Sequence, residues 1–250
     1  MESLVSAAGP PVFLVSPGEL RAEAVTLSGP EGHHAAAVRR LRVGERADVS
    51  DGAGTIAEGV VTAIARDSVV IAVRSVRSAP PPQPRITVVQ ALPKGDRGEL
   101  AVGLMTEIGV DSVIAWAAER CVARWHGERG TRALGKWRAA AREATKQSRR
   151  AWMPGVTGPA ALADVTKLVA AAACALVLEA DAATPLSRLA LPGEGDILLV
   201  VGPEGGISPA ERAALTAAGA IEARLGPTVL RTSTAGAAAA AVLLSRTRRW

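Results

Sequence analysis

Two glycine-containing stretches in the last fifth of the chain hold the residues best suited to chemistry. In VVGPEGGISPAE, residues 200–211, Glu204 is the one charged residue of a glycine-rich turn; in LGPTVLRTSTAG, residues 225–236, Arg231 stands alone among small and apolar residues. Glycine lets main-chain groups approach a flat ligand, a carboxylate can act as a base or balance a cation, and an arginine can stabilise developing negative charge. The structural alternatives are a turn that binds nothing and a buried arginine anchor.

Several common catalytic motifs do not occur in the sequence. The first stretch is neither the P-loop motif GxxxxGK[ST] nor the dinucleotide motif GxGxxG, which disfavours an NTPase or a nucleotide-dependent dehydrogenase. There is also no GxSxG element and no Ser-His-Asp signature.

A long basic segment covers residues 129–150. It carries eight basic residues and one acid, so its local charge of +7 exceeds the +5 of the whole chain. Three of the cations recur at every fourth residue and share one helix face: Arg138, Arg142 and Lys146. The opposite face is apolar: Leu134, Trp137, Ala141 and Ala144. Like charges four residues apart destabilise a helix, and a phosphate partner would offset this, so we expect nucleic acid here rather than a merely solvated face.

A smaller basic cluster, HHAAAVRRLR, lies at residues 33–42. It contributes these side chains: His33, His34, Arg39, Arg40 and Arg42. Adjacent histidines on a helix point in different directions, and no cysteine or carboxylate set completes a ligand group. We therefore expect no metal site.

The composition fits a cytoplasmic protein with a polyanionic partner; the alternative is a codon bias toward Ala, Gly and Arg with a solvated basic surface. Of the 29 basic residues four are lysines, so 29 − 4 = 25 are arginines, and the guanidinium fork matches phosphate geometry. Two cysteines, Cys121 and Cys174, give no disulfide framework. The N-terminus has no basic region ahead of its apolar residues, so we expect no signal peptide. The alanine-rich runs at 169–178 and 235–244 are too short to span a bilayer.

Proline-rich SAPPPQPR at 78–85 predicts a linker between two domains, because its prolines favour extended backbone. Before it, short β-branched runs separated by Gly or Asp turns predict a small barrel with one helical segment at 31–42. The predicted strands are 12–15, 47–51, 59–65 and 68–76.

After the linker, strand and helix patterns alternate, which predicts an α/β domain with a mainly parallel sheet and helices on both faces. The predicted strands are 85–92, 110–118, 174–180 and 196–202; the predicted helices are 95–109, 131–150 and 233–249. A further helix should begin at Ser208, with Pro209 in its first turn, Glu211 completing a capping box and Gly219 ending it. The glycine-rich turn thus lies at the carboxyl end of a strand, where ligands bind in open α/β sheets.

These motifs together resemble one family. VVGPEGGISPAE and LGPTVLRTSTA resemble the SPOUT methyltransferases, specifically the family that methylates ring nitrogen 3 of a uridine in 16S ribosomal RNA. The resemblance extends over nearly the whole chain, through His34, the Leu41-Arg42 pair, ALPKGDRGEL, TEIGV and the segment 147–150. The second motif departs from the family pattern at Ser233, where Glu is usual.

The resemblance implies a PUA-like RNA-binding barrel at 1–77, the proline-rich linker at 78–85, and a SPOUT domain with a trefoil knot at 86–250. It implies a homodimer acting on 16S rRNA or on the assembled small subunit, with no membrane partner. S-adenosylmethionine would be the cofactor, held by Leu178, Glu179, Val201, Gly202, Pro203, Glu204, Gly205, Gly206, Leu225, Gly226, Val229 and Leu230. From the resemblance and the two basic clusters together, we expect the following residues to bind RNA: His34, Arg39, Arg42, Arg138, Arg142, Lys146, Gln147, Arg149 and Arg150.

The implied reaction is direct attack of the uridine nitrogen on the sulfonium methyl group, which needs alignment more than covalent chemistry. Arg231 would stabilise the uridine oxygens as they gain charge, since arginine stays protonated. Glu204 would be either a base or a counter-charge to the sulfonium. The alternatives are a SPOUT enzyme with another RNA target and a non-catalytic RNA-binding or assembly protein of the same fold.

Overall fold

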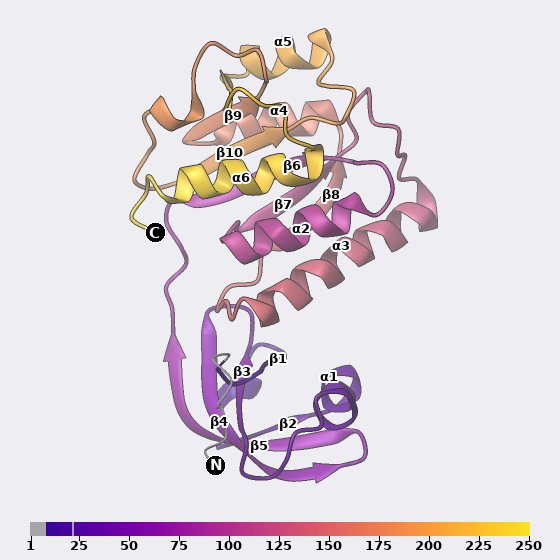
Figure 1. Ribbon diagram of the computed structural model, residues 1–250, viewed down its shortest axis with the longest axis vertical. Coiled ribbons are helices and arrows are strands. Elements are labelled where there is room, and N and C mark those ends of the chain that lie inside the picture. Colours follow the sequence, from indigo (N-terminus) through magenta and orange to yellow (C-terminus); the bar gives the residue numbers. More distant parts are fainter. Residues whose placement is uncertain (1–8, 22) are drawn as a thin grey trace. The chain divides into compact units, whose positions relative to one another are not determined.

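The structure is a computed structural model that describes residues 9–21 and 23–250. Contacts divide the chain into two compact units (Figure 1). The first unit runs to Pro81 and takes in Thr145–Met153; the second comprises Pro82–Ala144 and Pro154–Trp250. The expectation that the N-terminus holds no signal peptide falls on residues 1–8, which lie outside the described residues.

The first unit is built on a five-stranded sheet in the order β1-β3-β4-β5-β2. Its strands are β1 Val12–Leu14, β2 Ala24–Leu27, β3 Arg46–Ser50, β4 Thr55–Ala65 and β5 Ser68–Ser78. The β1–β3 pair is parallel, and the remaining pairs are antiparallel. The four strands predicted here are confirmed, whereas β2 was not foreseen. Inward side chains such as Phe13, Val49 and Ile71 form the core of this unit.

The predicted helix at 31–42 is wrong in its extent. The helical turns are a 3-10 turn at Glu19–Arg21, α1 Gly29–His33 and a π-helical turn at His34–Val38. Arg40 then takes a positive φ of 52°, and the Leu41 N–H donates to the Ala35 carbonyl at 3.1 Å. This reversal places Leu41 in the core. The helix therefore ends where Leu41 is buried, although the pattern of charged residues alone predicted that it would continue.

The second unit contains a six-stranded sheet, all of whose pairs are parallel, in the order β11-β9-β10-β6-β7-β8. Its strands are β6 Arg85–Ala91, β7 Ser112–Trp116, β8 Gly155–Ala160, β9 Cys174–Leu178, β10 Asp196–Val201 and β11 Ile221–Ala223. The predicted parallel sheet is confirmed. Strand β8, GVTGPA, was missed because its glycines and proline are poor strand formers; as an edge strand it can tolerate proline.

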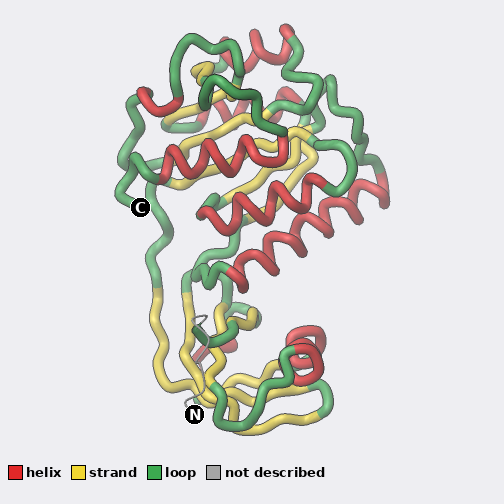
Figure 2. The backbone as a smooth tube through the Cα atoms, viewed as in Figure 1, coloured by secondary structure: helices red, strands yellow, loops and turns green. Residues whose placement is uncertain are grey.

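Helices cover the parallel sheet (Figures 1 and 2). They are α2 Arg97–Ile108, α3 Gly127–Gln147, α4 Leu162–Ala171, a 3-10 turn at Leu186–Arg188, α5 Pro209–Ala217 and α6 Thr232–Leu244. Helix α6 packs on α2 and on strands β6 and β10, while α4 contacts β9 and α5. Helix α4 was not predicted. The helices that were predicted in this unit, now α2, α3, α5 and α6, are confirmed, with ends that differ by a few residues.

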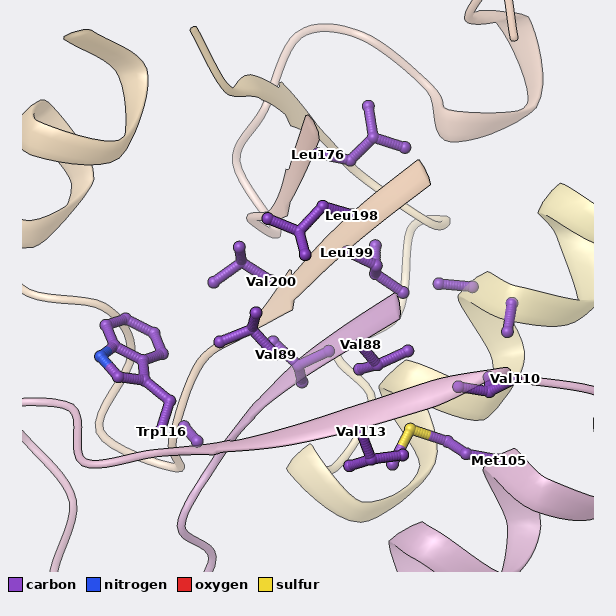
Figure 3. Packing of buried hydrophobic residues seen from close by; sticks show 14 of the residues in the cluster. Val88, Val89, Met105, Val110, Val113, Trp116, Leu176, Leu198, Leu199 and Val200 are labelled. Atoms are coloured by element: carbon purple, nitrogen blue, oxygen red, sulfur yellow. The ribbon is translucent and has the colours of Figure 1, made fainter. Parts of the chain in front are cut away.

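The core of the second unit is aliphatic, as the scarcity of aromatics requires. Strands β6 and β10 are buried at every position after the first, which is typical of parallel strands covered on both faces. Figure 3 shows Val88 and Val89 of β6 beside Leu199 and Val200 of β10, with Met105 of α2 reaching toward the sheet.

Helix α5 begins with the predicted capping box. Ser208 is the N-cap: its Oγ accepts from the Glu211 N–H at 3.3 Å, and the Glu211 carboxylate accepts from the Ser208 N–H at 3.0 Å. Gly219 follows the end of this helix and has φ of 107°. Helices often end at a residue with positive φ, and glycine adopts that conformation without strain.

The chain after α6 is anchored to the beginning of the sheet through Arg249. Its guanidinium donates to the carbonyls of Gly109 at 2.8 Å and Pro84 at 3.1 Å, and it pairs with the Asp111 carboxylate. Asp111 also accepts from the Ile86 N–H at 2.8 Å. The side chains of Arg249 and Asp111 are only 13% and 6% exposed, so little solvent is left to screen the pair.

We expect Arg249→Ala to lower the free energy of unfolding by about 3 kcal/mol, because it leaves a buried carboxylate without its cation. Urea unfolding followed by circular dichroism measures the change. Arg248→Ala is the matched control: Arg248 is exposed, and its loss should change stability by no more than about 0.5 kcal/mol. Equal effects of the two variants would show that the anchor contributes nothing.

Candidate functional site

A cavity of about 380 Å³ lies beyond the carboxyl ends of β9 and β10. Its walls come from the residues that follow β9, β10 and β11, and from the first turn of α6. This is the edge of a parallel sheet where ligands bind. Segments far apart in the sequence therefore form a single site.

Every predicted cofactor residue except Gly205 lines this cavity. The further lining residues are Ala180, Ile207, Ala223, Thr228, Arg231, Thr232 and Ala235. These further residues lie close to the motif residues in the sequence. Only the folded path of the chain shows that they also line the cavity. The structure thus brings the two glycine-containing stretches into one cavity.

The glycine-rich turn requires glycine at two of its lining positions. A Cβ on Gly202 would lie 2.7 Å from the Ile207 Cγ1, and Ile207 is buried. Gly206 has φ of 72°, a conformation that L side chains rarely adopt, and its N–H donates to the Pro203 carbonyl at 2.9 Å. At both positions the cavity wall is therefore main chain.

Two neighbouring loops hold the turn. The Lys94 N–H, just after β6, donates to the Glu204 carboxylate at 3.2 Å. Arg120, after β7, donates to the Gly205 carbonyl at 3.2 Å, and its Cβ would lie 3.4 Å from a Cβ on Gly205. Gly205 therefore contacts the β7 loop and is not among the cavity-lining residues. No sequence pattern predicted either contact.

Arg231 lies at the cavity, at the N-cap position of α6. It is exposed, so the interpretation as a buried anchor is wrong. The hydroxyl side chains that follow it do not cap α6, whose N-cap is Arg231 with no side-chain capping bond. Thr232 and Ser233 are buried in the first turn, and the Thr234 Oγ1 donates back to the Arg231 carbonyl at 3.1 Å.

The side chain of Glu179 is the half-buried carboxylate of the cavity. Burial raises the pKa of Glu179, and the nearby carboxylates of Asp181 and Glu222 raise it further, while Arg212 opposes them. Arg212 is itself held by Glu222 and by Asp181, the latter at 3.3 Å. The fold therefore disfavours the charged form of Glu179.

We expect Glu179→Gln to stabilise the ligand-free protein at neutral and higher pH. A raised pKa in the folded state means that the wild type loses stability as the pH rises through that pKa, and the amide removes this loss. Below the ordinary glutamate pKa of about 4.3 the difference should vanish. Thermal unfolding at a series of pH values measures it, with Glu107→Gln as the control at an exposed position on α2. A difference that does not change with pH would refute this.

The predicted RNA-binding residues divide between the two units. Seven lie in the first unit: His34, Arg39, Arg42, Lys146, Gln147, Arg149 and Arg150. Arg138 and Arg142 lie in the second. The ring of His34 packs edge-on against Phe13, with centroids 6.2 Å apart. Arg39, Arg42, Gln147 and Arg149 are exposed.

The predicted basic face of α3 is only partly open. Its apolar stripe is confirmed, since Trp137, Ala141 and Ala144 are buried. Lys146, however, forms an ion pair with Glu31 at 3.3 Å, and its side chain is only 9% exposed. Arg138 is exposed, with its Nε donating to the Val156 carbonyl at 3.0 Å. Of the three cations predicted to share a nucleic-acid-binding face, Lys146 is therefore already paired with an acid distant in the sequence.

Neither a metal centre nor a membrane segment is found in the part of the chain that the structure describes. Its histidines, cysteines and carboxylates form no group of three or more that could hold a metal ion. None of its helices is both long and apolar enough to cross a bilayer.

Comparison with known proteins gives consistent matches along the chain. Residues 80–244 match the RNA methyltransferase domain family, and residues 27–74 match the RNA methyltransferase PUA domain family. Ribosomal RNA small subunit methyltransferase E of Mycobacterium tuberculosis is 49% identical over 228 residues, which cover 90% of this chain and 87% of that protein. The protein of the same name from Bacillus subtilis is 28% identical over 218 residues, covering 84% and 85% of the two chains.

Solved structures agree with these sequence matches. A methyltransferase from Legionella pneumophila in complex with its bound cofactor SAM has a TM-score of 0.86 and 27% identity, covering 96% of this chain and 99% of that chain. Ribosomal RNA small subunit methyltransferase E from Neisseria gonorrhoeae, bound to S-adenosyl methionine, shares the fold with a TM-score of 0.82 at 24% identity, covering 95% and 98% of the two chains. The expected PUA-like and methyltransferase domains are confirmed.

Proposed function

This chain belongs to the ribosomal RNA small subunit methyltransferase E family, and we propose that it methylates ring nitrogen 3 of a uridine in 16S ribosomal RNA. It is an S-adenosylmethionine-dependent rRNA methyltransferase with a PUA domain ahead of a parallel-sheet methyltransferase domain. The observation that carries the proposal is the cavity at the ends of β9 and β10, lined by both motif stretches.

The residues of the cavity fit S-adenosylmethionine. Its volume of about 380 Å³ lies in the usual range for small-molecule sites, about 300–1,000 Å³. Gly202, Gly206 and Gly226 leave main-chain groups to bind the ligand, while Leu178 and Leu225 supply apolar walls. The bound cofactor would supply an electrophilic methyl group on a positively charged sulfur.

Three charged side chains of the cavity have proposed roles. Arg231, exposed at the N-terminus of α6, binds the uridine oxygens as negative charge develops on them. Glu204 is oriented through its bond from the Lys94 N–H and acts either as the base for the uridine proton or as a counter-charge to the sulfonium. Glu179, half-buried in the cavity wall, would bind a polar group of the cofactor.

The architecture expected from the family completes the proposal. The first sheet closes into a PUA-like barrel, and the segments around the cavity form a trefoil knot, which is supported by the convergence of residues after β9, β10 and β11. A second copy joins to form a homodimer. Val229 and Leu230, at the rim of the cavity, are 85% and 39% exposed, and a partner subunit would cover them. The protein acts in the cytoplasm on 16S rRNA or on the assembled small subunit.

The direct test is mass spectrometry of 16S rRNA from cells with and without the gene for this protein. We expect one methylated uridine to be lost with the gene and restored with it, and fragmentation should place the methyl group on the base. A methyl group lost from another RNA would point to a different substrate. An unchanged methylation pattern, with no S-adenosylmethionine binding by calorimetry, would favour a non-catalytic RNA-binding protein and overturn the proposal.

We expect Arg231→Ala to lower methyl transfer by about 10²–10³-fold, the usual cost of removing one donor that stabilises developing charge. The fold should persist because the Arg231 side chain caps nothing in α6. Single-turnover transfer of a radioactive methyl group to unmethylated 16S rRNA measures the effect. Arg188→Ala, at an exposed position outside the cavity, should retain activity. Wild-type turnover by Arg231→Ala would remove the proposed role.

A further inference from the structure

We call the cavity at the ends of β9 and β10, proposed above to bind S-adenosylmethionine, the cofactor pocket. A second, separate cavity of about 350 Å³ also lies within the methyltransferase unit. Its lining residues lie outside the two glycine-containing stretches and are not among the individually predicted RNA-binding residues, but they include parts of ALPKGDRGEL and of the basic segment 129–150. It is lined by the loop that leads into α2, the segment after β7 and the first half of α3. We call it the α3 cavity. Its charged lining residues are Glu99, Arg124, Arg129, Arg132 and Lys136.

Two tryptophans form the aromatic part of the α3 cavity. Trp125 and Trp137 pack edge to face, with centroids 4.9 Å apart and an interplanar angle of 76°. Trp137 is buried against Gly98, whose Cβ would lie 2.3 Å from the indole Nε1. Trp125 is half-buried. The inner ring thus supports an outer ring that still has surface available, an arrangement on which a nucleobase can stack.

The cations along one side of α3 are available for phosphate. Arg129, Arg132 and Lys136 are spaced at three and four residues and therefore share one helix face. Within the described chain, no ion pair is found for Arg129 or Lys136, and Arg132 makes only an exposed contact with Glu128 at 3.5 Å. Exposed pairs of this kind are weak, so the face keeps most of its positive charge.

Arg124 has a different role at the α3 cavity. Its guanidinium donates to the main-chain carbonyls of Glu119 at 3.0 Å and of Cys121. These bonds hold the segment between β7 and α3, and so position Trp125, which follows directly. Arg124 is therefore a positioning residue rather than a phosphate ligand.

The walls of the α3 cavity are connected to the cofactor pocket by hydrogen bonds. Pro93 and Gly95 line the α3 cavity on either side of Lys94, whose N–H donates to Glu204 of the cofactor pocket. The segment after β7 is joined to the glycine-rich turn by Arg120. Hydrogen bonds therefore join the loops around the α3 cavity to the turn that lines the other cavity.

We propose that the α3 cavity binds one nucleotide of the substrate RNA strand, with its base stacked on Trp125 and its phosphate held by Arg129 and Lys136. The assignment of RNA as the ligand rests on the proposed function. The charge of the cavity and its aromatic wall are the two features that single-stranded RNA sites combine. A nucleotide bound here would hold the strand beside the Lys94 loop, whose main chain is hydrogen-bonded to Glu204.

The test compares two variants with a control of equal charge. Arg129→Gln/Lys136→Gln removes the phosphate ligands, Trp125→Leu removes the stacking surface, and Lys167→Gln/Arg188→Gln removes two exposed cations elsewhere. The probes are poly(U), as a single strand, and unmethylated 16S rRNA. Circular dichroism and the affinity for S-adenosylmethionine, which we expect to be unchanged, verify each fold.

We expect the double glutamine variant to weaken poly(U) binding at least tenfold and to reduce the slope of log affinity against log salt by about 1.4, two contacts at about 0.7 each. Trp125→Leu should weaken binding fivefold or more without changing that slope. With rRNA, both variants should raise KM while kcat stays within twofold.

Binding of poly(U) by both variants that matches the control, at every salt concentration, would overturn the proposal. So would a variant whose affinity falls for uridine monophosphate but not for poly(U), because the cavity would then be a small-molecule site. Should Trp125→Leu fail to fold, the glutamine variant still decides the outcome. The poly(U) measurements do not depend on methyl transfer, so a wild type that binds through this cavity but modifies no RNA would refute the proposed function alone.

Discussion

The carboxylate of Glu211 accepts hydrogen bonds from two main-chain N–H groups, that of Ser208 at 3.0 Å and that of Glu119 at 2.7 Å. The first bond begins helix α5, and the second fastens that helix to the segment after β7. Glu211 is only 4% exposed, so water cannot replace either bond, and charge-assisted bonds of this kind are strong. The glycine-rich turn at 202–206, which has few side chains of its own, depends on this attachment for its position.

A cofactor pocket built largely from main chain needs such external supports. Glycines at 202 and 206 remove side chains from the wall, but they also increase the freedom of the unfolded chain. Contacts from outside the turn hold it in its folded position. They join Lys94 to Glu204, Arg120 to Gly205, and Glu211 to the neighbouring loop. Part of the turn's stability therefore resides in residues that do not touch the cofactor pocket.

Sequence patterns predicted most of the helices and strands, but they did not predict most contacts between residues far apart in the chain. The parallel strands, the capping box and the glycine after α5 follow from burial and backbone rules that act over a few residues. The cofactor residues came from the family resemblance, because spacing alone could not bring 178, 201 and 225 together. The pairing of Lys146 with Glu31 and of Arg249 with Asp111 joins positions more than a hundred residues apart, and no local rule indicates such partners.

The two cavities differ in how they use charge, and the difference matches the proposed ligands. The cofactor pocket contains Arg231 together with Glu179 and Glu204, and the exposed Glu204 carboxylate favours a positively charged sulfur. The α3 cavity presents arginine and lysine beside an indole ring, which attracts a phosphate and repels a sulfonium. Because attraction and repulsion both contribute to specificity, each ligand is directed to its own cavity. Hydrogen bonds from Lys94 to Glu204 and from Arg120 to Gly205 join the loops of the two cavities.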